Sequence, residues 1–81
     1  MISCNEYDYV EIVCMYHYPI KLTMKKGEVT EGIALDTQLN DKREECIKVD
    51  VDGKECIIPL NTISSLEVCI ENPHLQKVSF S

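Results

Sequence analysis

The sequence predicts a mainly β fold: five to six short strands in a small barrel or bent antiparallel sheet, behind one N-terminal α-helix. Three observations lead to this prediction. Runs of alternating apolar and polar residues recur after Pro19. Tight-turn signals separate these runs, and a capped segment with helical periodicity precedes them. With 81 residues, the chain is expected to form one domain over residues 1–81.

The N-terminal segment is expected to be a helix over about residues 3–16. Ser3, with Glu6 three residues later, matches a capping box, and acids in the first turns suit the helix dipole. Asp8 and Glu11 lie outside the apolar set and are expected to stay exposed. The residues expected to face the core recur at helical spacing: Val10, Val13, Cys14 and His17.

The strands are expected between about residues 20 and 80. From Ile20 the apolar period becomes two, which predicts a half-buried strand that ends at a Lys26-Gly27 turn. A bulge is expected at Gly32. Residues 37–45 are polar and highly charged, which predicts a loop. A second strand is expected through Val29, Ile33 and Leu35, although Glu31 breaks its alternation.

The clearest local signal is the pair Asp52-Gly53. A two-residue type I′ hairpin prefers this pair because both positions require positive φ. The loop length also sets the pairing of the two flanking strands. The expected opposite residues are Val49 with Cys56 and Ile47 with Ile58 on the core face, and Lys48 with Ile57 on the other face.

The rest of the chain is expected to complete the sheet. Pro59 cannot donate a ladder hydrogen bond, so it is placed at a strand end, before a short helical turn over Leu60–Ile63. A strand through Leu66, Val68 and Ile70 is expected to end at Asn72-Pro73. Val78 and Phe80 then predict a short last strand that covers the sheet edge. Such a fold is typical of Sm-like, SH3 and OB barrels.

The charge distribution favours a basic partner. The net charge is −6, and the first 17 residues contain the acids Glu6, Asp8 and Glu11 but none of the eight Lys and Arg residues. An acidic N-terminal element repels nucleic acid and attracts a basic surface. No apolar run is long enough to span a bilayer, and the N-terminus lacks the lysines of a signal peptide, so a cytoplasmic protein is expected.

The sequence does not favour catalysis or metal binding. It contains no P-loop, GxSxG or HExxH pattern, so no enzyme activity and no cofactor are expected. Five cysteines without a CxxC pair fit reduced thiols, most of them in the core. Cys4, Cys14 and His17 do not have the spacing of a standard zinc site. His17 and His74 are expected to be structural.

Three classes of function follow. The first is a module that binds another protein through Tyr7 and the neighbouring acids, since Tyr is enriched at interface hot spots. The second is an Sm-like module that binds RNA directly, which places aromatics in a basic groove. The third is a cysteine-based metal or redox protein. In this sequence the tyrosines lie in or beside the acidic helix, and the only aromatic residue of the expected strands is Phe80. The first class is therefore favoured.

The N-terminal segment resembles a known family. The pattern I-x-C-x-x-Y-D-x-x-E-x-x-C runs from Ile2 to Cys14, and Leu22 and the Lys26-Gly27-Glu28 turn follow. This pattern resembles the N-terminal half of the Rof family of Rho-binding antiterminators. A weaker resemblance continues through the central loop, the Asp52-Gly53 hairpin and the turn at residues 60–63.

The resemblance implies a single Rof-like domain, an N-terminal helix on a small Sm-like β-barrel. It also implies binding to the transcription termination factor Rho at its primary RNA-binding site, which keeps RNA away. Tyr7, Asp8 and Glu11 match the family's helix motif and would be the contacts, with Glu6 beside them. Lys42 and Arg43 lie in the loop that would supply a second contact. The free protein is expected to be a monomer that does not bind nucleic acid or membrane.

Overall fold

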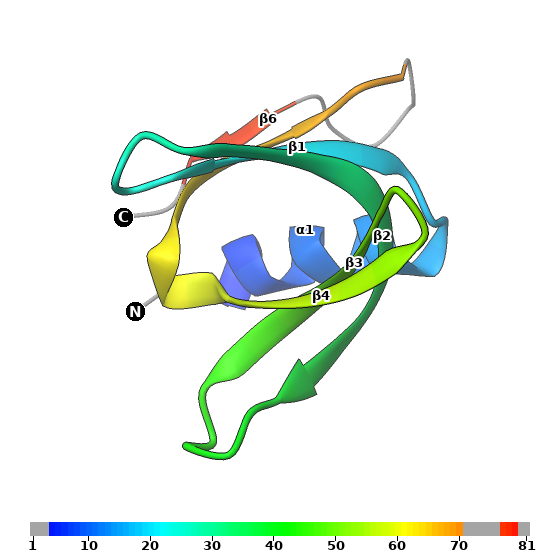
Figure 1. Cartoon of the computed structure of the whole chain (residues 1–81). Coiled ribbons are helices and arrows are strands. Elements are labelled where there is room, and N and C mark those ends of the chain that lie inside the picture. Colours follow the sequence, from blue (N-terminus) through cyan, green and yellow to red (C-terminus); the bar gives the residue numbers. More distant parts are fainter. Residues whose placement is uncertain (1–3, 71–76, 80–81) are drawn as a thin grey trace.

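The computed structural model describes residues 4–70 and 77–79 and confirms the mainly β fold with its N-terminal helix. Helix α1 (Cys4–Met15) precedes a six-stranded antiparallel sheet with the order β4-β3-β2-β1-β5-β6. In Figure 1 the sheet curls into an incomplete ring of strands, and α1 lies across it, in contact with β2 and β6. The strands are β1 (Pro19–Met24), β2 (Val29–Leu39), β3 (Glu45–Val51), β4 (Lys54–Pro59), β5 (Ile63–Val68) and β6 (Lys77–Ser79).

Helix α1 turns its apolar side towards the sheet. Val10 and Val13 are fully buried and Cys14 is buried, as predicted. The helix ends in a left-handed residue, His17, with a φ of 52°. The amide of Tyr18 donates to the Val13 carbonyl at 3.0 Å, and the amide of His17 donates to the Cys14 carbonyl at 3.2 Å. These two hydrogen bonds form a Schellman motif, which ends the helix before the strand begins at Pro19.

The prediction that His17 faces the core is wrong. Its left-handed backbone takes the side chain out of the helical repeat, and the residue is exposed. The Nδ1 atom lies 3.0 Å from the Ala34 carbonyl oxygen. Because a carbonyl only accepts, Nδ1 carries the proton and donates it, which ties the end of α1 to β2.

Strand β1 alternates as predicted. Ile20 and Leu22 are buried, and Met24 packs against the core. The following turn also agrees with the sequence. Gly27 has a φ of 98°, and its amide donates to the Met24 carbonyl at 2.9 Å.

The predicted second strand is present as β2, but its apolar residues do not form a core side. Val29 and Ile33 are exposed, at 53% and 38%, whereas Ala34 is fully buried. The less exposed residues of this stretch are Thr30, Gly32 and Ala34, so the alternate residues Val29, Glu31 and Ile33 point outward.

The β-bulge lies between Ala34 and Asp36, and not at Gly32 as predicted. Gly32 has a different role. A Cβ atom at Gly32 would overlap the carbonyl oxygen of Asp50 and lie 2.7 Å from Cγ1 of Val49. The residue is glycine because the backbone of β3 leaves no room for a side chain.

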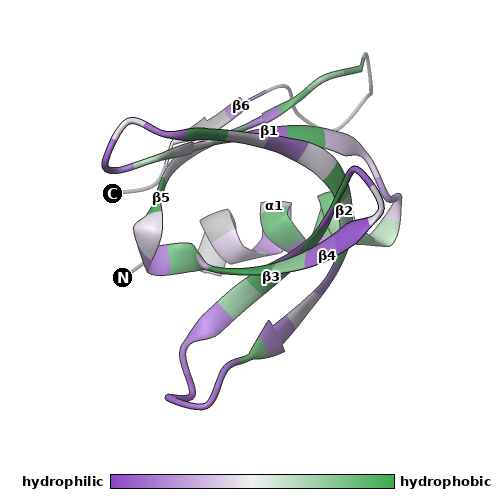
Figure 2. Cartoon of the chain, in the orientation of Figure 1, coloured by the Kyte–Doolittle hydropathy of each residue, from purple (hydrophilic) through white to green (hydrophobic). Residues whose placement is uncertain are grey.

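The predicted loop over residues 37–45 is much shorter in the structure. Strand β2 continues to Leu39, and β3 begins at Glu45, which pairs with it. The connection is residues 40–44. This end of the hairpin is a two-stranded ribbon, and its tip is polar and coloured as hydrophilic in Figure 2. Its backbone hydrogen bonds are made between the strands, so its polarity does not distinguish strand from loop.

The connection between β2 and β3 is organised by Asn40 and Glu44. The Oδ1 atom of Asn40 accepts from the amides of Lys42 at 2.9 Å and of Glu44 at 3.0 Å. The Glu44 carboxylate accepts from Nδ2 of Asn40 at 2.9 Å and from Nδ2 of Asn61 at 3.0 Å. These bonds, Asn40 first and Asn61 second, lower the pKa of Glu44 below its usual value.

The Asp52-Gly53 hairpin has the predicted geometry. Asp52 and Gly53 have φ values of 53° and 86°. The pairing between β3 and β4 is the predicted one: Val49 with Cys56, Ile47 with Ile58 and Lys48 with Ile57. On the core face Ile47 and Val49 are fully buried, whereas Ile57 on the other face is 40% exposed.

The remaining predictions agree with the structure where it describes them. Pro59 ends β4, and a 3₁₀ turn, η1 (Leu60–Thr62), follows. Leu66 and Val68 are buried in β5, but Ile70 lies beyond the strand and is 46% exposed. Strand β6 pairs with β5 and covers that edge of the sheet. The predicted end at Asn72-Pro73 and the residue Phe80 lie outside the described residues.

Replacing Gly32 should destabilise the fold. We expect Gly32→Ala to lower the free energy of unfolding by about 1–3 kcal/mol, because the new methyl group must push against the β3 backbone. Urea denaturation would measure this loss. Gln38→Ala in the exposed part of β2 is the control and should change stability much less. Equal stability of the two variants would contradict the close approach at Gly32.

The pKa of Glu44 should depend on Asn61. We expect Asn61→Ala to raise the Glu44 pKa towards its usual value, and NMR titration of the carboxyl would measure it. Because the folded-state pKa is lowered, the stabilisation from these bonds is present above the usual Glu pKa and is lost as pH falls through the lowered one. Thr62→Ala is the control, since the Thr62 hydroxyl donates to the Pro59 carbonyl and not to Glu44. If the pKa of Glu44 is the same in Asn61→Ala as in the wild type, the hydrogen bond from Asn61 does not lower it.

Candidate functional site

The solvent side of α1 presents two carboxylates. Asp8 and Glu11 are exposed, as predicted, and their spacing of three residues places them on one side of the helix. Neither forms an ion pair with another described residue. The ion pairs among residues 4–70 and 77–79 lie on the sheet, each at 3.8 Å: Lys21 with Glu67 and Lys48 with Glu55.

Tyr7 lies at the border of this side of the helix. It is half-buried and packs against the core, while Glu11 follows it one turn later. Sequence reasoning did not identify Met15, which lies four residues after Glu11 and is 70% exposed. The spacing of Asp8, Glu11 and Met15, three and then four residues, is the signal that could have found it. We call these four residues, Tyr7, Asp8, Glu11 and Met15, the acidic helix face.

The other tyrosines lie elsewhere. Tyr9 is 39% exposed on another side of α1. Tyr16 and Tyr18 stack on each other, with ring centroids 5.4 Å apart and planes inclined by 19°. Tyr18 also packs against the core. The stacked pair therefore belongs to the end of the helix and the start of β1.

The remaining predicted site residues are not all brought together. Glu6 belongs to the first turn of α1, and its side chain lies outside the described part of the structure. Lys42 and Arg43 are exposed in the connection between β2 and β3, where Arg43 has a φ of 61°. Figure 1 shows the tip of this hairpin projecting beyond the ring of strands. Within the described residues, no ion pair joins it to α1.

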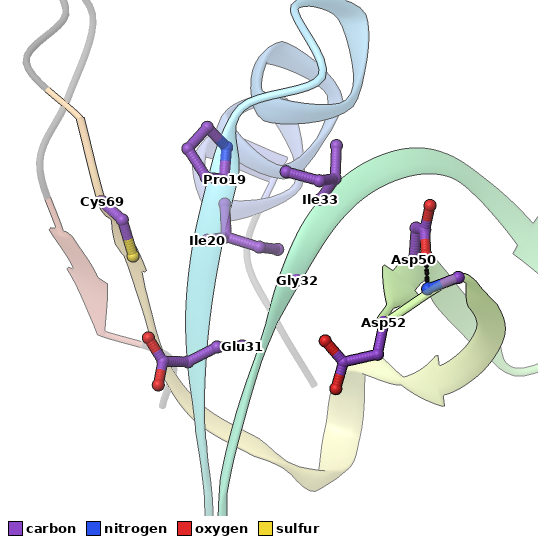
Figure 3. A pocket seen from close by; sticks show the side chains of 9 residues that line it. Pro19, Ile20, Glu31, Gly32, Ile33, Asp50, Asp52 and Cys69 are labelled. Atoms are coloured by element: carbon purple, nitrogen blue, oxygen red, sulfur yellow. Dashed lines mark hydrogen bonds between the residues drawn. The ribbon is translucent and has the colours of Figure 1, made fainter.

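A second region with acidic side chains is a shallow hollow of about 450 Å³ on the sheet. Gly32 is among its lining residues, and Figure 3 shows Glu31, Asp50 and Asp52 around it. Asp50 is engaged, because its Oδ1 accepts from the Gly53 amide at 2.8 Å. No Lys or Arg is among the described residues that line this hollow. Its charge therefore does not suit a phosphate backbone.

The cysteines are free thiols in mixed surroundings. Cys14 and Cys46 are buried, Cys56 is half-buried and Cys69 is exposed, so only part of the set lies in the core. Cys4, the third member of the zinc pattern, has its side chain outside the described part. Among residues 4–70 and 77–79, no cluster of three His, Cys, Asp or Glu side chains has the arrangement of a metal site. In the same residues, no helix is long and apolar enough to span a membrane.

The chain is similar to characterised proteins over most of its length. Residues 1–80 match the family described as "Modulator of Rho-dependent transcription termination (ROF)". "Protein rof" of Escherichia coli (strain K12) is 31% identical over 64 residues, which cover 79% of this chain and 75% of that protein. The protein of the same name from Shigella flexneri matches to the same extent, 31% over 64 residues.

The fold has a solved counterpart. The structure described as "YaeO bound to Magnesium from Vibrio cholerae O395" superposes with a TM-score of 0.87 at 41% sequence identity. The match covers 93% of this chain and 97% of that chain. The family match over nearly the whole sequence and this common fold agree with each other. The chain therefore belongs to the ROF family of modulators of Rho-dependent transcription termination.

Proposed function

We propose that this chain binds the transcription termination factor Rho at its primary RNA-binding site through the acidic helix face, and so blocks RNA loading. The observation that carries the proposal is the pair of exposed carboxylates, Asp8 and Glu11, which have no ion-pair partner among the described residues. Membership of a family that modulates Rho-dependent termination supports Rho as the partner. In this role the protein inhibits termination without catalysing a reaction.

The chemistry of RNA binding supports the choice of surface. A site that binds RNA must present Lys and Arg to the phosphates and planar groups to the bases. Asp8 and Glu11 offer the charge that a phosphate would offer. Tyr7 offers an aromatic edge beside them, since it is only half-buried. The helix face and RNA then compete for the same groups of Rho.

Exposed charges act mainly on the rate of encounter. An ion pair in solvent contributes only about 0–1 kcal/mol and is screened by salt, whereas complementary fields raise the association rate. The net charge of −6 attracts a basic partner while the two proteins diffuse towards each other. Affinity must then come from the groups that become buried, which include Tyr7 and Met15.

The location follows from the partner. Rho acts on RNA as it is transcribed, so we place the protein in the cytoplasm, as a monomer until it binds. Lys42 and Arg43 form a second contact in this proposal. Their position on a projecting hairpin, stiffened by the hydrogen bonds of Asn40, allows them to reach a surface beyond the helix.

Charge reversal on the helix face should weaken binding to Rho. We expect Asp8→Lys and Glu11→Lys each to raise the Kd at least about tenfold, because like charges brought together cost several kcal/mol. Titration with purified Rho, followed by fluorescence anisotropy, would measure the change. Tyr7→Phe tests the hydroxyl while keeping the core contact, which Tyr7→Ala would remove.

Glu28→Lys is the matched control for these variants. Glu28 is exposed in the turn between β1 and β2, so the net charge changes equally while the helix face stays intact. Circular dichroism should show the same spectrum for all the variants. If Asp8→Lys and Glu11→Lys bind Rho as tightly as Glu28→Lys does, the wrong surface has been chosen.

The wild-type chain should displace single-stranded RNA from Rho and should not bind that RNA itself. We expect its direct binding to Rho, without RNA, to weaken as salt is raised from about 50 to about 200 mM, since the Debye length shortens to about 8 Å or less. Gel shift with labelled RNA, with and without Rho, separates the two activities. A shift of RNA by this chain alone would instead support the Sm-like RNA-binding module.

A further inference from the structure

A groove lies beside the acidic helix face, between the last turns of α1 and strand β2. Its volume is about 360 Å³, roughly ten times the ~30 Å³ that one water molecule occupies in the liquid. The groove is therefore large enough to hold one long side chain. Its polar lining comes from Glu11, His17, Asp36 and Thr37, and its apolar lining includes Met15 and Leu35.

The groove is rich in hydrogen-bond acceptors. Glu11 is exposed, with no ion-pair partner among the described residues. Oδ1 of Asp36 accepts from the Thr37 amide at 2.8 Å, which holds this carboxylate while leaving its other oxygen available. Since Nδ1 of His17 donates to the Ala34 carbonyl, Nε2 is the ring nitrogen that can accept when the ring carries a single proton.

The two carboxylates act on the same point of the groove. Burial raises the pKa of the Cys14 thiol to about 12, and the charges of Asp36 and Glu11 add to this rise. Cys14 is thus a neutral thiol in the groove lining. The negative charges that raise its pKa come from α1, through Glu11, and from β2, through Asp36. No Lys or Arg is among the described residues that line the groove.

We infer that this groove receives one Lys or Arg side chain of the partner, held between Glu11 and Asp36 with its aliphatic part against Met15. The inference rests on the proposed function and extends the binding surface from α1 to β2. A guanidinium group suits the site best, because its five donors can serve two carboxylates and an imidazole nitrogen at once. The methylene groups of an Arg side chain pack on apolar surface, which Met15 supplies here.

The inference makes Asp36 a specificity-determining residue that sequence reasoning did not identify. Asp36 is far from α1 in the sequence and lies at the bulge of β2, yet it lines the same groove as Glu11. A surface of α1 alone would bind a basic patch of any shape. A groove with acceptors on two walls binds a single cation in a defined place.

Asp36→Asn tests the groove in the full chain, with Asp52→Asn as the matched control. The control has the same chemical change in the turn between β3 and β4, outside the groove lining, and Asn-Gly suits the same hairpin turn. We expect Asp36→Asn to raise the Kd for purified Rho at least about fivefold. We expect Asp52→Asn to bind as the wild type does.

A double-mutant cycle with Glu11→Gln tests whether the two walls hold the same cation. If they do, the Asp36→Asn, Glu11→Gln double variant should lose less than the product of the two single losses, because the cation has already left the groove. Losses that multiply would overturn the inference, as would a loss in Asp52→Asn equal to that in Asp36→Asn.

The result also distinguishes the inference from the proposed function. If wild-type protein binds Rho, Glu11→Lys weakens binding and Asp36→Asn does not, then the groove is empty in the complex and only the inference fails. If wild-type protein does not bind Rho at all, the proposed function fails and the inference fails with it.

Discussion

The packing of α1 against the bent sheet is the constraint on which the rest of the structure depends. A chain this small buries few residues, and Val10 and Val13 of the helix are among those with no exposed surface. With that side of α1 committed to the core, the acids at the opposite positions have to face solvent, because an unpaired buried carboxylate is costly. The acidic helix face is therefore a consequence of how the core is closed.

The same packing places the helix end beside β2 and creates the groove. The Schellman motif stops α1 at its last apolar residues, and the hydrogen bond from His17 to Ala34 holds that end on the sheet. Single exposed charges contribute little affinity, so a partner gains more where carboxylates meet apolar surface. In this fold such a place is found around Met15, where residues from α1 and β2 come together.

The sequence predicted best those elements whose signals are local. Two residues with positive φ determined the hairpin at Asp52-Gly53, and its length then determined the pairing of β3 with β4. The prediction was wrong where a polar composition was the only signal for a loop. Residues 37–45 read as loop because most of them are polar, yet residues 37–39 are strand, since a projecting ribbon can satisfy its backbone while its side chains stay in water.

The sequence by itself determined the fold class, the exposure of Asp8 and Glu11 and the family pattern, because helical and strand periodicity and turn chemistry act over a few residues. Only the tertiary structure decided which side of β2 faces the core and which residues stand opposite Glu11. These depend on a bulge after Ala34 and on the close approach of β3 at Gly32. Both are contacts between strands, and no short stretch of sequence contains them.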